Sequence, residues 1–272
     1  MMAHSSPLHF RQALITGGST GIGEALVRLL AEEGAVDAIT FTGRHAAALD
    51  PLVEQLRRVH PRQKVTAFVA DLAEPQGRRS LVEWIEKQRP DLLVNNAGAG
   101  FYGSLIEQSH EQLEAMVGLN ALAIAQLSRA AAKALIDHGE KGIILNVSSA
   151  AAPLPFPYFS LYTATKAFAT QFSLCLDGEM EPLGVRVLVA LPGMVDTQFR
   201  ERAGGQRQLR GWLKPMTPQY AAQQLLRQIA RRQSLYTFHA GYRWALALSG
   251  WLSRRWLASL LGRSIRRLSN KE

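Results

Sequence analysis

Residues 13–23 read ALITGGSTGIG, a short apolar run that passes directly into a glycine-rich turn. The residues that follow, up to position 33, carry apolar side chains at helical spacing. Glycine lets the backbone adopt positive φ angles and approach a ligand closely, and the first turn of a helix presents free N–H groups to a phosphate. The stretch therefore predicts a strand, a phosphate-binding turn and a helix, which is how a dinucleotide-binding unit begins.

The same alternation of short apolar runs with longer amphipathic stretches continues along the chain. The expected strands are residues 13–16, 38–42, 65–70, 92–95, 143–147 and 185–191. The expected helices are residues 23–33, 47–59, 75–88, 112–137, 163–180 and 217–233, the last begun by Thr217 and Pro218. Crossovers of this kind are right-handed and place helices on both faces of a sheet. We therefore predict an α/β fold with a Rossmann-type, doubly wound parallel sheet.

The length of 272 residues, with 47% hydrophobic and 19% charged side chains, fits one sizeable domain. We expect a catalytic domain at residues 1–240, with a mobile substrate loop at about 197–216, and a basic helical extension at 241–272. The single cysteine, Cys175, favours a reducing compartment, and residues 1–11 lack the pattern of a signal peptide. We expect a soluble cytoplasmic protein without a metal site, because the seven histidines lack metal-ligand spacing.

The positive charge of the chain is concentrated in its last quarter. Residues 200–272 hold 15 Lys and Arg against two acids, a balance of +13, whereas the whole chain carries +9. Near the end, Trp, Leu and Arg interleave at helical spacing, which argues against a nucleic-acid partner and fits two short helices that break near Gly250 or Gly262. Two interpretations stay open. The helices pack on the domain with arginine stems over apolar surface, or they contact the inner face of a membrane peripherally, with Trp at headgroup depth.

Arg44 follows the second expected strand, where an NAD site usually places an acid that holds the ribose 2′-hydroxyl. Residues 41–45 contain no acid. An arginine at this place pairs well with the additional 2′-phosphate of NADP, so we expect NADP(H) rather than NAD(H). The alternative is a solvated surface arginine.

Two further clusters follow expected strands, at the carboxyl ends where open α/β sheets bind ligands. Asp71 and Leu72 come after the third strand, and the Asp71 carboxylate is suited to accept a hydrogen bond from the adenine amino group. Asn96, Ala97 and Gly98 come after the fourth strand, where the two small residues leave room for a ribose. Such residues also form turns for steric reasons alone.

Tyr162, Lys166 and Ser149 point most directly to chemistry. Tyr162 and Lys166 are four residues apart and share one helical face, and Ser149 ends the fifth strand 13 residues before the tyrosine. Free tyrosine has a pKa of about 10, but a neighbouring ammonium and an oxidised nicotinamide favour the phenolate and bring this pKa toward neutrality. The serine hydroxyl is suited to hold a substrate oxygen beside the tyrosine.

Taken in order along the chain, these motifs resemble the short-chain dehydrogenase/reductase family, in its compact single-domain branch. The motifs are Thr16-Gly17-x-x-x-Gly21-x-Gly23, Asn95-Asn96-Ala97-Gly98, Asn120, Ser149, Tyr162-x-x-x-Lys166 and Pro192-Gly193-x-x-x-Thr197. They span roughly residues 10–200, and no motif of the family is missing.

The resemblance implies a hydride-transferring oxidoreductase in which Tyr162 is the general acid or base and Ser149, rather than Ser148, polarises the substrate. It implies that Lys166 holds the nicotinamide ribose and lowers the pKa of the tyrosine. It also implies that Asn120 distorts its helix and anchors a water that relays protons to Lys166. The expected cofactor-binding residues are Gly17, Ser19, Thr20, Gly21, Ile22, Gly23, Arg44, Asp71, Leu72, Asn96, Ala97, Gly98, Tyr162, Lys166, Pro192, Gly193, Val195 and Thr197.

The substrate is expected to be lipophilic. Residues 150–160 are rich in proline and aromatic side chains and hold no charge, and Phe101, Tyr102 and Met194 are expected to extend an apolar pocket. We therefore expect a lipophilic ketone or secondary alcohol, such as a long-chain 3-keto lipid or a steroid-like ketone. The basic tail agrees with this, since it resembles extensions of relatives that handle lipid-like substrates near membranes.

Two other functions compete with this one. A non-catalytic NADP(H)-binding sensor or scaffold would act through the basic tail, but such proteins usually lose the Tyr162 or Lys166 equivalent. A nucleotide-sugar epimerase or dehydratase would normally carry a Gly-x-x-Gly-x-x-Gly turn, which the sequence lacks. The long alanine-rich helices at 112–137 and 163–180 also indicate a homo-oligomer, unless their small residues only pack closely on the sheet.

Overall fold

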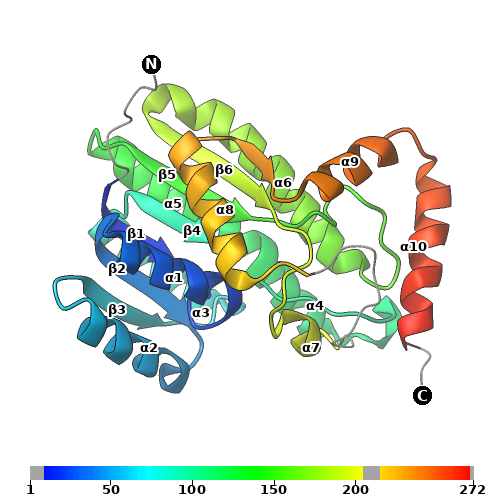
Figure 1. Ribbon diagram of the computed structural model, residues 1–272, viewed down its shortest axis with the longest axis horizontal. Helices are drawn as coiled ribbons and strands as arrows, with labels where there is room; N and C mark the ends of the chain where they lie inside the picture. Colours follow the sequence, from blue (N-terminus) through cyan, green and yellow to red (C-terminus); the bar gives the residue numbers. More distant parts are fainter. Residues whose placement is uncertain (1–8, 205–214, 270–272) are drawn as a thin grey trace.

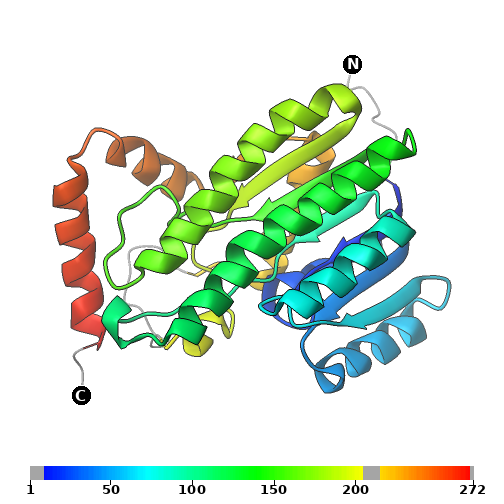
Figure 2. The ribbon, with the colours of Figure 1, turned by 180° about the vertical axis from the view of Figure 1, so that it is seen from behind.

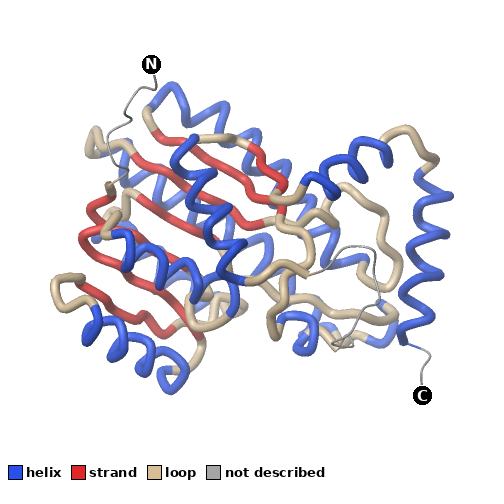
Figure 3. The backbone as a smooth tube through the Cα atoms, viewed as in Figure 1, coloured by secondary structure: helices blue, strands red, loops and turns tan. Residues whose placement is uncertain are grey.

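Seven parallel strands form one sheet in the computed structural model, which describes residues 9–204 and 215–269, with side chains as far as Arg263. The strands are β1 (Phe10–Ile15), β2 (Val36–Gly43), β3 (Lys64–Val69), β4 (Leu92–Asn95), β5 (Gly142–Val147), β6 (Val185–Leu191) and β7 (Leu235–Thr237). Across the sheet they follow the order β3-β2-β1-β4-β5-β6-β7 (Figure 3). The chain winds outward from β1 to β3, returns beside β1 and then winds the other way, which confirms the predicted doubly wound fold.

Helices cover both faces of the sheet. Figure 1 shows α1 (Gly21–Glu33), α2 (Ala46–Val59) and α8 (Pro218–Arg231) in front, and Figure 2 shows α3 (Pro75–Gln88), α5 (Ala123–Asp137) and α6 (Ser160–Met180) behind. Successive residues of a strand point to opposite faces. Leu14 and Ile15 of β1 accordingly enter two different cores, one packed against α5 and the other against α1 and α8. The strand and helix positions predicted from periodicity agree with these elements within a few residues.

The helix predicted at 112–137 is interrupted. It consists of α4 (His110–Val117), a π-helical turn over Gly118–Leu122, and α5. Ser109 starts α4 with a capping box. Its side chain accepts from the backbone N–H of Gln112, and the Gln112 side chain accepts from the backbone N–H of Ser109. The run from His110 to Asp137 is long and apolar enough to cross a membrane, but 61% of its most apolar stretch is buried inside the structure, as in a core helix.

Two elements near the sheet edge refine the prediction. β7 has three residues and was not expected, because a run this short shows no strand periodicity. α8 begins as predicted, since the Thr217 side chain accepts from the backbone N–H of Tyr220. Part of the predicted loop at 197–214 forms the short helix α7 (Phe199–Arg202), and residues 205–214 of that loop lie outside the described residues.

The chain ends in two helices that extend from the body: α9 (Ala240–Ser249) and α10 (Arg254–Ser269). We call this pair the C-terminal arm. It bends after Gly250, one of the two predicted break points, whereas Gly262 lies inside α10. In Figure 1 the arm stands at the end of the molecule opposite α2.

Candidate active site

The residues predicted to bind a cofactor gather at the carboxyl ends of the strands. β1 and β4 are neighbours in the sheet, and the chain winds away from them in opposite directions. Ligands of open α/β sheets bind at such a switch point. In register, Ile15 of β1 pairs with Phe41 on one side and Val94 on the other, so the loops after these strands emerge side by side.

The glycine-rich turn has the geometry of a phosphate cradle. Gly17 has a φ of 66° and Gly21 a φ of 61°, values that favour glycine. A Cβ on Gly17 would lie 2.9 Å from the Cα of Ala97, and one on Gly21 would lie 3.1 Å from Cγ2 of Thr197. Thr20 precedes α1 without a side-chain cap, which leaves the first N–H groups of the helix available to a phosphate. The turn therefore fits a dinucleotide.

Asn96 braces this turn. Its side-chain amide donates to the carbonyl oxygens of Thr16 and Gly17 at 3.0 and 3.2 Å. The Thr16 hydroxyl in turn accepts from the backbone N–H groups of Asn96 and Ala97, both at 3.0 Å. The side chain of Asn96 thus holds the shape of the cofactor turn from behind, while the small residues Ala97 and Gly98 leave the space in front of it.

At the adenosine end, Arg44 is exposed directly after β2. A Cβ on the preceding residue, Gly43, would lie 3.2 Å from the hydroxyl oxygen of Ser19, so the glycine turn and the end of β2 are in close contact. Asp71 uses one carboxylate oxygen to accept from the backbone N–H of Ala73 at 3.0 Å, and Leu72 is buried.

Tyr162 and Lys166 lie one turn apart on α6 and face the interior. They are only 8% and 3% exposed, and the ammonium of Lys166 is 5.8 Å from the centre of the tyrosine ring. The ammonium donates a hydrogen bond of 2.9 Å to the carbonyl oxygen of Val147, the last residue of β5. The strand end and the helix therefore hold each other in a defined orientation.

Neighbouring serines after β5 have different surroundings. The Ser148 hydroxyl donates to the carbonyl oxygen of Lys166 and also contacts the Thr170 hydroxyl, both at 2.7 Å, so it ties the strand end to α6. The Ser149 hydroxyl accepts from the backbone N–H of Ala151 and hydrogen-bonds the Tyr162 hydroxyl. The serine that reaches the tyrosine is thus Ser149.

Asn120 lies within the π-helical turn between α4 and α5. Its side chain accepts from the backbone N–H of Ala99 at 2.9 Å and donates to the carbonyl oxygen of Ala99 at 2.8 Å and to the Thr165 hydroxyl at 3.1 Å. A Cβ on Gly98 would lie 3.3 Å from both the Asn120 side-chain oxygen and the Lys166 ammonium. Asn120 and Lys166 therefore border the same small space.

Burial governs the protonation of this cluster. It raises the pKa of Tyr162 well above the ordinary range, while the hydrogen bond from Ser149 opposes that shift and the nearby Tyr102 adds to it. Burial also lowers the pKa of Lys166 to about 8. Before a cofactor binds, the tyrosine is accordingly a protonated acid and the lysine loses its charge as the pH rises through about 8. The expected lowering of the Tyr162 pKa by Lys166 is not found in this state, because burial outweighs it.

Tyr162 belongs to an aromatic cluster. Its ring stacks on Phe159 with a centroid distance of 4.2 Å, Phe159 stacks on Tyr102 at 4.0 Å, and Phe199 of α7 lies 5.5 Å from Tyr162. Tyr158 has a φ of 63°, a left-handed turn that directs the chain into the cluster just before Phe159. Phe199 lies in no sequence motif and was therefore not predicted to be a site residue.

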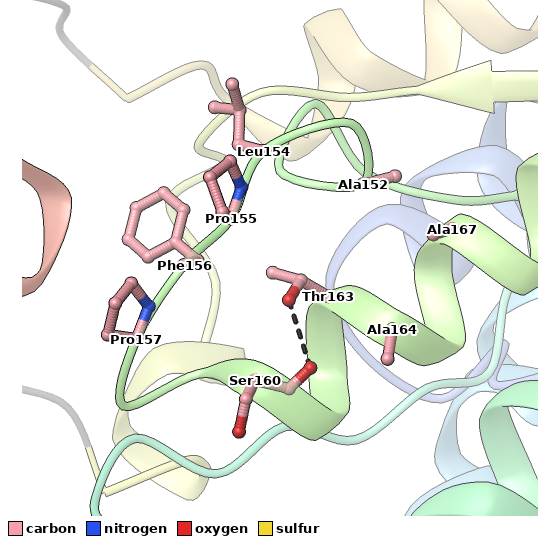
Figure 4. Close-up of a pocket in the computed structure, with 9 residues that line it drawn as sticks. All are labelled: Ala152, Leu154, Pro155, Phe156, Pro157, Ser160, Thr163, Ala164 and Ala167. Atoms are coloured by element: carbon pink, nitrogen blue, oxygen red, sulfur yellow. Dashed lines mark hydrogen bonds between the residues drawn. The ribbon is translucent and has the colours of Figure 1, made fainter. Parts of the chain in front are cut away.

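The apolar segment 150–160, from which we expected a lipophilic substrate, faces Tyr162 over only part of its length. Leu154, Pro155, Phe156 and Pro157 line an apolar hollow of about 360 Å³ against Ser160, Thr163, Ala164 and Ala167 of α6 (Figure 4). These α6 positions occupy the face opposite Tyr162 and Lys166. Most of the segment therefore lies away from Tyr162, and its end at Phe159 stacks on the tyrosine ring.

The C-terminal arm contributes a residue that sequence analysis missed. The ring of Tyr242 in α9 packs directly on Gly193, where there is no space for a Cβ. Its hydroxyl accepts from the backbone N–H of Met194 at 3.1 Å. Arg200 contacts the sulfur of Met194 and hydrogen-bonds Tyr102, which brings a positive charge to the edge of the aromatic cluster. No sequence motif marks Tyr242, since its contact joins residues about fifty positions apart.

A dinucleotide cradle beside a buried tyrosine, serine and lysine defines a class of protein: an oxidoreductase that acts on alcohol or carbonyl groups with a nicotinamide cofactor. The sequence profile of the short chain dehydrogenase family matches residues 11–208. The chain belongs to this family, the short-chain dehydrogenases/reductases.

Individual relatives agree with this assignment. An uncharacterised oxidoreductase of Methylorubrum extorquens is 33% identical over 201 residues, which are 73% of this chain and 79% of that protein. A solved short-chain dehydrogenase from Sphingobium yanoikuyae, in complex with NADPH, has a TM-score of 0.80 and 30% identity, covering 92% of this chain and 95% of that one. The bulky-bulky ketone specific alcohol dehydrogenase from Comamonas testosteroni has a TM-score of 0.75 and 25% identity, covering 92% and 94%.

Proposed function

We propose that this protein is an NADP(H)-dependent reductase of lipophilic ketones. The observation that carries the proposal is the position of Tyr162, whose hydroxyl meets Ser149 while its ring is stacked within apolar aromatic side chains. A substrate carbonyl that reaches these two hydroxyls must pass along aromatic surface, which favours an apolar body on either side of the reacting carbon.

The chain's own residues supply orientation and a proton. When bound, the nicotinamide cofactor supplies the hydride. Ser149 donates a hydrogen bond to the carbonyl oxygen and Tyr162 transfers its proton to that oxygen as the carbon is reduced, giving a secondary alcohol and an oxidised cofactor. Lys166 and Asn120 border the space through which a proton returns to the tyrosine.

The preference for NADP(H) rests on Arg44 and Ser19. Arg44 is an exposed cation directly after β2, and the Ser19 hydroxyl adjoins Gly43. Together they offer a guanidinium and a hydroxyl to a 2′-phosphate. NADPH in the Sphingobium yanoikuyae relative supports this choice.

Two observations support the proposed substrate class: the aromatic cluster around Tyr162, and the ketone specificity in the description of one structural relative. The Comamonas testosteroni enzyme is described as specific for bulky-bulky ketones, and the rings of Tyr102, Phe159 and Phe199 offer this chain an apolar wall. A long-chain 3-keto lipid or a steroid-like ketone is the proposed substrate.

The test follows the oxidation of NADPH and of NADH by absorbance, with ketones that range from small and polar to long-chain. Wild type is compared with Tyr162→Phe and with Tyr220→Phe, a control on the surface of α8. The proposal expects NADPH-dependent turnover of lipophilic ketones that is lost in Tyr162→Phe alone. Turnover of small polar ketones only would overturn the substrate class. Tight NADPH binding without any turnover would favour the non-catalytic sensor instead.

We also propose a homo-oligomer that pairs through α6. The outward side of this helix exposes Phe168 and Leu174, and Phe168 stacks on Phe172 at 5.6 Å. Light scattering after size-exclusion chromatography tests this, and a monomer at micromolar concentration would contradict it.

A further inference from the structure

We propose that the C-terminal arm docks on the surface of an anionic lipid membrane. The arm was defined above as α9 and α10, and most of its large apolar side chains point to solvent rather than into the body. Trp251 is 91% exposed and Trp244 is 70% exposed, and the others of this kind are Leu248, Leu252, Trp256 and Leu260. Three of the five tryptophans of the chain therefore lie on one exposed arm.

Four of these side chains form stripes on the helices, two on α9 and two on α10, and Trp251 and Leu252 lie in the turn between the helices. In α9, Trp244 and Leu248 are four residues apart, opposite Tyr242, which packs on the body. In α10, Trp256 and Leu260 are four residues apart and point away from Gly262, which faces Pro157 of the body. An amphipathic helix with its apolar stripe toward water has no partner within the part of the chain that the structure describes.

The charge of the arm is of one sign. Residues 202–271 contain no Asp or Glu at all. Arg243, Arg255 and Arg263 are exposed on the arm, and the ion pairs found among residues 9–204 and 215–263 involve none of them. Tryptophan prefers the headgroup depth of a bilayer and arginine binds lipid phosphates, so an anionic leaflet satisfies both sets of side chains at once.

A second copy of the chain is a poorer occupant of this surface. Pairing two arms brings arginines together with no acid of the arm helices to neutralise them, and like charges across a contact oppose association. The lipid surface is therefore the occupant that the charge pattern favours.

Three of the arm's contacts with the body join it to the loop after β6 and to the segment 150–160. Tyr242 accepts from Met194, Arg254 donates to the carbonyl oxygen of Pro153 at 2.8 Å, and a Cβ on Gly262 would lie 3.2 Å from Pro157. Figure 4 shows α10 beside Phe156 and Pro157, at the rim of the apolar hollow. Docking through the arm thus places the segment 150–160 next to the bilayer, where a lipophilic ketone dissolves. The docking itself does not depend on the proposed function.

The experiment measures binding of the full chain to sedimented vesicles, made either of phosphatidylcholine alone or of phosphatidylcholine mixed with phosphatidylglycerol. One variant removes the apolar contact, Trp251→Gln with Trp256→Gln, and another reverses charge, Arg255→Glu with Arg263→Glu. Matched controls at the opposite end of the molecule are Val59→Gln and Arg58→Glu with Arg62→Glu, all exposed positions on or next to α2. Thermal unfolding and NADPH binding without vesicles verify that each variant is folded.

We expect the wild type to bind the mixed vesicles, to bind neutral vesicles at least tenfold more weakly, and to be released by salt. A basic residue near an anionic leaflet contributes roughly a fivefold factor to partitioning, so the arm variants are expected to lose at least tenfold while the α2 controls keep wild-type binding. Equal binding of arm and control variants, or no binding by folded wild type, would overturn the proposal. Loss of a dimer in the arm variants without vesicle binding by wild type would assign the surface to a second copy instead.

Discussion

The backbone N–H of Met194 donates a hydrogen bond of 3.1 Å to the hydroxyl oxygen of Tyr242. This contact links α9 of the C-terminal arm to the loop after β6, within the motif in which the family holds the nicotinamide end of its cofactor. The loop is thus supported from outside by a helix that the family motifs do not include.

Removing that support should weaken cofactor binding. Tyr242→Phe deletes one hydrogen bond, worth about 1 kcal/mol, and we expect the Kd for NADPH to rise about fivefold. Gly193→Ala introduces a Cβ where the Tyr242 ring lies, so it should displace α9 and weaken NADPH binding further. Fluorescence titration measures both effects, with Tyr220→Phe as the control. An unchanged Kd for NADPH in both variants would show that Tyr242 packs on Gly193 without contributing to cofactor binding.

The two adjacent serines should separate activity from stability. Ser149→Ala removes the hydroxyl that meets Tyr162, and we expect kcat to fall about 100- to 1000-fold with little change in Tm. Ser148→Ala removes a buried hydroxyl that is bonded to the Lys166 carbonyl, and we expect a loss of about 1 to 3 kcal/mol of unfolding free energy with a smaller effect on kcat. Denaturant unfolding and steady-state kinetics measure the pair. A large loss of kcat in Ser148→Ala and a large loss of stability in Ser149→Ala would show that Ser148 is the serine that acts in the reaction.

Ketone reduction should decline above pH 8. Burial lowers the pKa of Lys166 to about 8, so its positive charge is lost as the pH rises through this value, while the raised pKa of Tyr162 keeps its proton in place. We expect kcat/KM for reduction to be level below pH 7 and to fall about tenfold per pH unit well above 8. Ser149→Ala, which leaves the lysine intact, should keep the same midpoint. A kcat/KM that stays constant up to pH 10 would show that the charge of Lys166 does not control the reduction.

Cofactor preference should depend on Arg44. Hydrogen bonds to a charged group are worth about 1.5 to 3 kcal/mol, so Arg44→Ala is expected to raise the KM for NADPH about 10- to 100-fold and leave the KM for NADH nearly unchanged. Arg58→Ala, on the exposed end of α2, serves as the control for loss of one positive charge. An equal change for both cofactors would place Arg44 outside the phosphate site.

A buried ion pair should dominate the stability of the edge of the sheet that β6 and β7 form. Arg186 donates two hydrogen bonds of 2.8 Å to Asp177, which also accepts from the Val187 backbone and the Ser234 hydroxyl. Asp177→Ala leaves the largely buried arginine with only Ser234 and the longer contact to Glu181, and we expect a loss of about 3 kcal/mol. Asp137→Ala, which breaks the exposed pair with Lys133, should cost less than about 1 kcal/mol. Denaturant titration compares the two.

The pH dependence of this pair follows from the Asp177 carboxyl. Burial alone would raise its pKa, but the hydrogen bonds from Arg186, Val187 and Ser234 outweigh burial and leave the pKa lowered. As the pH falls, the Asp177 carboxyl of the unfolded chain therefore takes up a proton before that of the folded chain. The stabilisation by the ion pair is present above the unfolded pKa of about 3.9 and is lost as the pH falls below that value toward the folded pKa. As the pH falls below the unfolded pKa, the difference in unfolding free energy between Asp177→Ala and wild type should shrink. A difference that stays constant from pH 7 into the acid range would contradict this.

Much of the fold was accessible from local patterns. The six longer strands, the major helices and the break at Gly250 follow from periodicity and turn residues, because each depends on side chains within a few positions of one another. β7 escaped prediction because three residues carry no period. The π-helical turn at Asn120 confirms the distortion that the family resemblance implied. Periodicity alone could not predict it, because Asn120 is held by Ala99 and Thr165, which are far away in sequence.

The site divides in the same way. The sequence by itself determined the reaction class, because the glycine turn and the spacing of Ser149, Tyr162 and Lys166 are written in order along the chain. Only the tertiary structure decided what surrounds them: Tyr242 against Gly193, Phe199 beside Tyr162, and the segment 150–160, most of which lies away from Tyr162. Local spacing sets which residues share a helix face or a strand end. Contacts between distant segments arise only when the elements pack, and no short stretch of sequence encodes them.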